Sequence, residues 1–151
     1  MNNTIVKNKV TSHTFKILIA FLFTILIALS SKISVPFYPV PMTMQTFVVL
    51  FTGFTLGARY GFIALSFYIL EGALGLPVFA GTPAKGVGIA YLLGPTGGYI
   101  LGYAFTAFLA GIFFSKRNIF FSKKNLPITF IKLTIALTPT YLIGILWLGI
   151  I

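Results

Sequence analysis

The segment from Leu76 to Tyr99 contains the residues best suited to binding a small molecule. Glycine and proline recur through it, and hydroxyl and basic side chains lie among them. Irregular backbone beside hydrocarbon must be buried in protein or line a polar cavity, because unpaired N–H and C=O groups are costly there. We therefore expect this segment to form the wall or the lid of a solute-binding pocket.

The residue types exclude several other kinds of chemistry. The sequence has no cysteine, which excludes disulfides, thiol catalysis and thiolate metal sites. Its one histidine, His13, lies in the polar N-terminal region, so we expect no metal site and no cofactor. The chain lacks a GxxxxGK[ST] phosphate-binding loop, so any use of ATP would belong to partner proteins. We expect a protein that binds or transports a solute and is not an enzyme.

The composition places the chain in a membrane. Hydrophobic residues make up 58% of its 151 residues and charged residues only 8%, a balance that a soluble domain would not tolerate. The net charge of +10 would suggest nucleic-acid binding in a soluble protein. Here the basic residues cluster between apolar runs, so they indicate loops that face an anionic membrane surface.

Five apolar runs are predicted to be membrane helices, because about 20 apolar residues span a bilayer. Prolines within residues 36–41 exclude helix before the second run, and Gly75 and Pro77 end the third. Pro139 is expected to kink the fifth, and the shorter runs favour tilted or broken helices. We treat the first run as a retained helix and not a signal peptide, because further spans follow it. The predicted helices cover residues 15–31, 45–57, 60–74, 96–115 and 126–151.

The basic residues predict the orientation in the membrane. If residues 1–14 form a cytoplasmic tail, the inward segments carry eight lysines and arginines and the outward segments carry two, Lys32 and Lys85. This orientation puts the loops at 33–44 and 76–95 on the outer side, where they would form the mouth of an uptake site. Residues 15–151 are expected to form one all-α membrane domain.

Several motifs, in order along the chain, resemble the BioY family of biotin transporters. They are VPMTMQTF (40–47), LGARYG (56–61), YILEGALGLPVFAG (68–81) and LGPTGGY (93–99). The likeness covers about residues 20–147. It implies a six-helix protein of the bacterial cytoplasmic membrane that captures biotin from outside as the S component of an energy-coupling-factor transporter. The implied partners are a transmembrane coupling subunit and ATPase subunits.

Members of this family continue past residues 146–148 into a sixth helix. That helix carries a Pro-Phe…Gly-Asp…Lys motif, which is thought to contribute an acidic and a basic contact to the ligand site. The present sequence ends before this motif, so we expect a family member that lacks the sixth helix. Two alternatives to biotin uptake therefore stay open, a remnant that no longer binds the vitamin and a membrane scaffold subunit of another complex.

Biotin has an apolar bicycle, a ureido group that donates and accepts hydrogen bonds, and a carboxylate. A pocket for it needs apolar walls and a few convergent polar groups. The ligand-binding residues that we expect on this basis are Gln45, Thr82, Lys85, Gly86, Tyr91, Thr96, Gly97, Gly98 and Tyr99.

Three of these assignments have structural alternatives. Lys85 could attract the carboxylate, or it could be a solvated loop lysine. The turn at 94–98 could bind an anion at the free N–H groups of a helix start, or Thr96 could cap that helix while the glycines allow close packing. Gln45 could bind the ureido group, or it could cap the second helix.

Glu71 is the only acidic residue and lies near the outer end of the third run. Ionisable groups within a membrane are usually functional. We favour a structural role, in which Glu71 pairs with Lys32 or Lys85 and anchors a loop.

Small side chains recur at every fourth position of the first run, at Ala20, Thr24 and Ala28. Such a strip lets helices approach closely. The family resemblance implies that the strip docks on the coupling subunit, and the alternative is packing within the same molecule.

Overall fold

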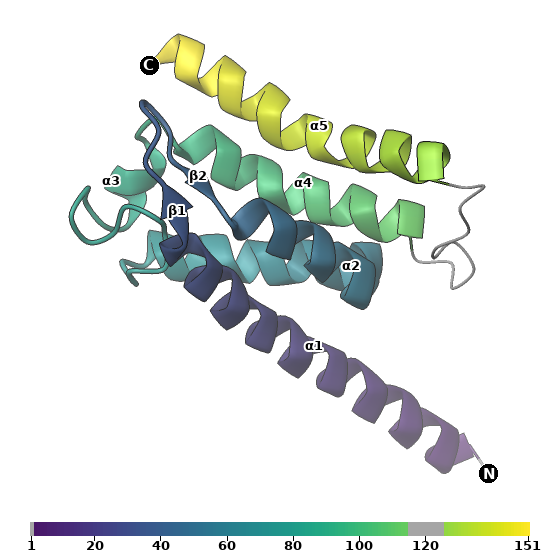
Figure 1. Ribbon diagram of the computed structural model, residues 1–151. Helices are drawn as coiled ribbons and strands as arrows, with labels where there is room; N and C mark the ends of the chain where they lie inside the picture. The colour runs from purple at the N-terminus through teal and green to yellow at the C-terminus, as the bar shows by residue number, and fades with distance from the viewer. Residues whose placement is uncertain (1, 115–125) are drawn as a thin grey trace.

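The computed structural model of the protein describes residues 2–114 and 126–151. In chain order the elements are α1 (Asn2–Lys32), β1 (Ser34–Val35), β2 (Met42–Thr43), α2 (Gln45–Ala73), α3 (Ile89–Leu92), α4 (Gly97–Phe114) and α5 (Leu126–Ile150). Four of these helices, α1, α2, α4 and α5, contain stretches long and apolar enough to cross a membrane (Figure 1). The predicted all-α architecture is confirmed apart from one short hairpin, with four candidate membrane helices among the described residues.

Helix α2 is broken at Gly57 and folds back on itself. The backbone there has φ 76° and ψ 174°, a conformation that glycine adopts without steric cost. A Cβ atom built on Gly61 would lie 3.2 Å from the Cα atom of Gly53, whereas eight residues of unbroken helix span about 12 Å. The runs predicted at 45–57 and 60–74 are therefore the two antiparallel arms of α2, which Figure 1 shows lying side by side.

Two local features differ from the prediction. Helix α1 begins at Asn2, so the helix continues through the region that we predicted as a cytoplasmic tail. The loop at 33–44 contains a short antiparallel hairpin in which Ser34 pairs with Thr43 and Val35 with Met42. Proline restricts the residue before it to extended conformations, and Val35 and Val40 both precede prolines, which favours this hairpin.

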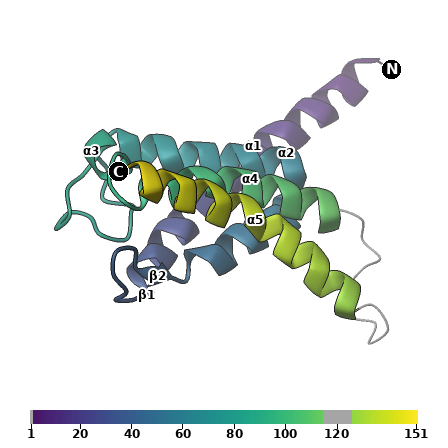
Figure 2. The same ribbon diagram turned by 90° about the horizontal axis from the view of Figure 1, so that it is seen from above.

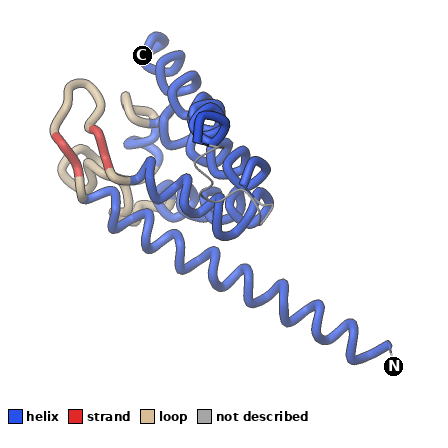
Figure 3. The backbone as a smooth tube through the Cα atoms, turned by 45° about the vertical axis from the view of Figure 1, so that its right-hand side comes forward, coloured by secondary structure: helices blue, strands red, loops and turns tan. Residues whose placement is uncertain are grey.

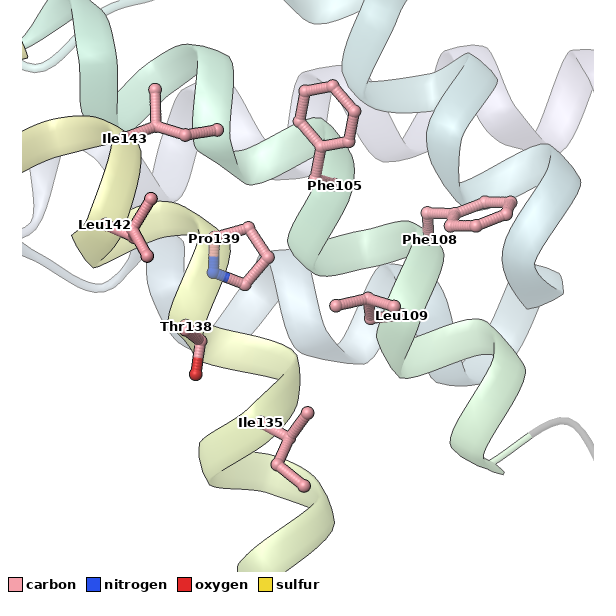
Figure 4. A pocket seen from close by; sticks show the side chains of 8 residues that line it. All are labelled: Phe105, Phe108, Leu109, Ile135, Thr138, Pro139, Leu142 and Ile143. Carbon is pink, nitrogen blue, oxygen red and sulfur yellow. The ribbon is translucent and has the colours of Figure 1, made fainter.

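The last two helices match the predicted bounds to within one residue, with Ser115 outside the described residues. Pro139 lies inside α5, and Figure 4 shows it where the ribbon of that helix changes direction. This bend is the expected effect of a proline that removes one helical hydrogen bond.

The long helices pack in the order α1, α2, α4, α5 (Figures 1 and 2). Small residues allow the close approaches: a Cβ atom on Gly53 would lie 2.4 Å from the carbonyl oxygen of Ala107, and one on Gly102 would lie 2.6 Å from the Cα atom of Thr140. The hydroxyl groups of Thr106 and Thr140 form a 2.8 Å hydrogen bond between α4 and α5. The largest fully buried apolar side chains of the core are Tyr68, Phe79, Ile27, Leu65 and Val49.

The irregular segments gather at one end of the bundle. Figure 3 shows the hairpin and the loops around α3 at the end where α1 finishes and α4 begins, with the C-terminus close by. The N-terminal part of α1 projects from the opposite end (Figure 1). The two loops that the sequence placed on one side of the membrane therefore lie on the same side of the molecule.

Candidate functional site

A cavity of about 340 Å³ lies between the β-hairpin and helices α2, α4 and α5. Its volume falls within the range of about 300–1,000 Å³ that is typical of small-molecule sites. We call it the hairpin cavity, and it is lined by Val40, Pro41, Met42, Thr43, Thr46, Tyr99, Tyr103, Thr140 and Tyr141.

A small recess of about 20 Å³ adjoins the hairpin cavity and shares several of its lining residues. The recess is bounded in addition by Gln45, Ala80, Tyr91, Thr96 and Ile100. Four of the predicted ligand-binding residues, Gln45, Tyr91, Thr96 and Tyr99, therefore come together at this site, from α2, α3 and the start of α4.

Gln45 is held in one orientation at the base of the recess, where it is only 3% exposed. Its amide nitrogen donates to the hydroxyl of Tyr68 at 2.5 Å, and its amide oxygen accepts from the hydroxyl of Thr43 at 3.2 Å. Tyr68 in turn donates to the carbonyl oxygen of Val78 at 3.1 Å. The helix-capping alternative for Gln45 is wrong, because its side chain bonds to the second arm of α2 and to the hairpin.

Tyr91 joins α3 to the preceding loop. Its hydroxyl accepts a hydrogen bond from the backbone N–H of Gly81 at 3.0 Å, and its ring stacks on Phe79 with a centroid distance of 5.2 Å. Tyr99 meets Tyr141 edge to face across α4 and α5, with centroids 6.4 Å apart. These aromatic contacts give the site rigid, apolar walls with hydroxyl groups attached.

Other predicted site residues lie outside the cavity and the recess. Lys85 is exposed and lines neither, and Gly86 has a positive φ of 98° with open space around it. Thr82 is buried, and its hydroxyl donates to the carbonyl oxygen of Phe79 at 2.7 Å. These three residues shape the loop, and the structure does not bring them to the site.

Gly97 and Gly98 serve close packing. A Cβ atom on Gly97 would lie 1.6 Å from the carbonyl oxygen of Leu92, and one on Gly98 would lie 2.3 Å from the Cβ atom of Trp147. The packing alternative therefore explains both glycines. Thr96 precedes α4 directly, and its carbonyl oxygen accepts the N–H of Ile100 at 3.1 Å.

Glu71 has a different partner from the predicted one. Its carboxylate accepts a 2.9 Å hydrogen bond from the hydroxyl of Thr24 on α1, and no ion pair with Lys32 or Lys85 is present in the described ranges. The ammonium group of Lys32 instead lies against the loop after α2, where it donates to backbone carbonyls. Lys32 thus anchors a loop, as expected, but through carbonyl oxygens and not through Glu71.

The small-residue strip of α1 packs inside the molecule. Ala20 and Thr24 have no exposed surface, and Ala28 is half-buried. Thr24 and Ala28 also line a hollow of about 370 Å³ on the surface of α1. The packing alternative therefore accounts for the burial of Ala20, and docking on a coupling subunit stays a prediction. Thr24 is buried because it meets Glu71 of α2.

Sequence reasoning missed several residues of the cavity, among them Tyr103, Thr43, Thr46 and Tyr141. For two of them, the spacing from a residue that we did predict could have indicated a place at the site. Tyr103 lies four residues after Tyr99, which puts both side chains on one face of α4, and Thr43 lies two residues before Gln45.

A second, larger hollow of about 550 Å³ lies between α4 and α5, as Figure 4 shows. Its described lining is apolar except for Thr138, whose hydroxyl donates to the carbonyl oxygen of Thr134 at 3.0 Å. The Thr138 hydroxyl is the only polar side-chain group of this described lining, and its proton is already used in that hydrogen bond. We place the candidate site at the hairpin cavity, because aromatic, aliphatic and several hydroxyl-bearing side chains line it together.

The model of the BioY family matches residues 2–151 of the chain. A protein of Pyrococcus horikoshii described as a probable biotin transporter BioY is 39% identical over 128 residues, which are 85% of this chain and 70% of that protein. The biotin transporter BioY of Thermotoga maritima is 46% identical over 99 residues, which are 66% of this chain and 57% of the relative.

The crystal structure of the S component for biotin from an ECF-type ABC transporter has the same fold. The TM-score is 0.72 at 29% sequence identity, and the match covers 99% of this chain and 75% of the solved one. With the family model matching almost every residue and the solved S component sharing its helix arrangement, the chain belongs to the BioY family.

Proposed function

We propose that the chain binds biotin in the hairpin cavity and acts as the substrate-capture subunit of an energy-coupling-factor transporter in the cytoplasmic membrane. The family match and the names of its relatives favour biotin as the solute. The observation that carries the proposal is a cavity with aromatic and aliphatic walls and several hydroxyl groups, together with an adjoining recess that the Gln45 side chain lines. This is the mixture that biotin requires.

The chemistry of the cavity suggests how biotin would lie. The bicycle would pack against Val40, Pro41 and the tyrosine rings, and the ureido group would exchange hydrogen bonds with hydroxyl groups near Gln45. In the described part of the chain no lysine or arginine lines the cavity, so the carboxylate would accept from tyrosine and threonine hydroxyls.

The proposed topology has five crossings, in which α1, the two arms of α2, α4 and α5 each span the membrane. The N-terminus would be cytoplasmic, and the end with the hairpin cavity would face outward. Release of biotin into the cell would depend on a transmembrane coupling subunit and ATPase subunits, because the chain has no phosphate-binding loop of its own.

The first test is equilibrium binding of labelled biotin to the purified protein in detergent. We expect saturable binding that unlabelled biotin competes. The Tyr103→Phe variant should raise the Kd about 5- to 150-fold, because losing one hydrogen-bonding group in a binding site costs about 1–3 kcal/mol.

The Leu142→Ala variant is the control, because Leu142 lines the hollow between α4 and α5 and not the hairpin cavity. Its Kd should stay unchanged. If Leu142→Ala weakens binding and Tyr103→Phe does not, the site lies between α4 and α5. If the protein binds no biotin at all, the proposal fails for this chain, and the remnant or scaffold alternatives take its place.

A further inference from the structure

The end of α1 is bound to the loop that follows α2. The ammonium group of Lys32, the last residue of α1, donates to the carbonyl oxygen of Phe79 at 2.8 Å and to that of Thr82 at 3.1 Å. It also lies 3.3 Å from the hydroxyl oxygen of Thr82. The hydroxyl of Ser31 donates to the carbonyl oxygen of Val78 at 2.8 Å. Two consecutive side chains of α1 thus hold residues 78–82 from about 50 positions away in the sequence.

The loop held in this way forms part of the recess wall. Ala80, which lines the recess, lies between the two residues whose carbonyls Lys32 binds. The neighbouring Phe79 ring stacks on Tyr91, and the N–H of Gly81 donates to the Tyr91 hydroxyl. Because Tyr91 also lines the recess, a displacement of residues 79–82 would change two of its walls.

Lys32 is suited to positioning the loop and not to binding the ligand. Its three N–H donors match the three loop oxygens, and its side chain does not line the hairpin cavity or the recess. The residue is exposed, so it contributes little buried surface to overall stability. Hydrogen bonds from a charged donor to carbonyl oxygens are stronger than those from a neutral donor. We therefore expect loss of the lysine to loosen the loop more than it lowers the stability of the whole protein.

We propose that Lys32 is a positioning residue for the biotin site, and that its ammonium group keeps residues 78–82 closed over the recess. The inference rests on the proposed function as far as biotin is concerned. We call the hydrogen bonds from Lys32 to residues 79 and 82 the clamp. The clamp is present in the ligand-free protein and can be tested without any ligand.

Hydrogen exchange of the ligand-free protein in detergent is the first test. The N–H groups of Gly81 and Thr82 form hydrogen bonds within or beside the loop. In the Lys32→Met variant, these amides should exchange at least about tenfold faster, because the loop opens locally, while amides in α4 keep their protection. Lys32→Arg should restore slow exchange, because arginine keeps the charge and the donors.

Lys85→Met is the matched control. Lys85 lies in the same loop and carries the same charge, but it is exposed and lies outside the site. Exchange in this variant should equal that of the unchanged protein. Equal exchange of the loop amides in Lys32→Met and Lys85→Met would overturn the proposal. If Lys32→Met also loses protection in α4, Lys32→Gln replaces it in the same comparison.

Biotin binding gives the second readout. The Lys32→Met variant should raise the Kd about ten- to a hundredfold, and Lys32→Arg should recover most of the affinity. An unchanged Kd together with faster loop exchange would mean that the clamp exists but does not position the site, which contradicts the proposal. If the unchanged protein binds no biotin, the proposed function fails, and the exchange experiment alone decides whether Lys32 clamps the loop.

Discussion

Tyr68 connects the candidate site to the loop that Lys32 holds. Its side chain is fully buried, its hydroxyl accepts from Gln45 and donates to Val78, and its ring meets Phe79 edge to face at 5.5 Å. The carbonyl of Val78 also accepts from Ser31 of α1. One hydroxyl therefore links the first arm of α2, the second arm and the loop, and it does so beside the recess.

At this scale we predict that Tyr68→Phe destabilises the protein by about 1–3 kcal/mol, because the Gln45 amide loses its acceptor in a buried position. Thermal unfolding in detergent measures the effect. Tyr38→Phe is the control, since Tyr38 is 97% exposed and loses only a solvated hydroxyl. Equal midpoints for the two variants would show that the buried hydroxyl contributes nothing to stability.

Helices α2 and α4 approach closely because α2 has a glycine where the two helices cross. Lipid tails are as apolar as the helix surfaces, so helices in a membrane associate by close packing and interhelical hydrogen bonds. Gly53 of α2 lies against the backbone of Ala107 in α4, and the Thr106–Thr140 hydrogen bond joins α4 to α5. Close approach at these points keeps α4 and α5 in place around the hairpin cavity.

For these elements we predict that Gly53→Ala lowers stability by about 1–3 kcal/mol, because the new methyl group would meet a backbone oxygen that cannot move aside. Gly149→Ala is the matched control, because a Cβ atom at Gly149 would meet nothing within 4 Å. Thermal unfolding of the two variants should differ clearly. If Gly53→Ala unfolds at the same temperature as Gly149→Ala, the two helices are less tightly packed than described.

The irregular segments of the molecule gather at one end of the helix bundle. The hairpin, the loop at 78–82, α3 and the start of α4 all lie at this end (Figure 3). The N-terminal part of α1 lies at the other end (Figure 1). The break at Gly57 lies near the C-terminal end of α4, because a Cβ atom on Gly111 would lie 2.4 Å from the carbonyl carbon of Gly57. The candidate site and the break in α2 therefore lie at opposite ends of the described helices.

At this largest scale we predict the orientation, and the absence of cysteine from the sequence makes a clean test possible. In intact cells, a membrane-impermeant maleimide should label the Tyr38→Cys variant and not the His13→Cys variant. Permeabilised cells should allow labelling of both, because both positions are exposed. The reverse pattern in intact cells would invert the proposed topology and place the hairpin cavity on the cytoplasmic side.

Much of the fold could be predicted from the sequence, because hydrophobic runs, glycines and prolines act locally. They determined the membrane class, the apolar runs, the break near Gly57 and the bend at Pro139. The motifs around Gln45 and at 93–99 also indicated the family, and the glycine- and proline-rich segment lies at the same end of the molecule as the candidate site.

Only the tertiary structure decided the partners of individual side chains. Lys32 binds loop carbonyls, Glu71 accepts from Thr24, and Gln45 bonds to Tyr68, at sequence separations of 23 to 50 residues. The hairpin cavity likewise combines the hairpin, α4 and α5. Short-range sequence patterns do not predict such pairings, because the pairings depend on how closely the helices approach each other. Packing across the whole bundle sets that distance.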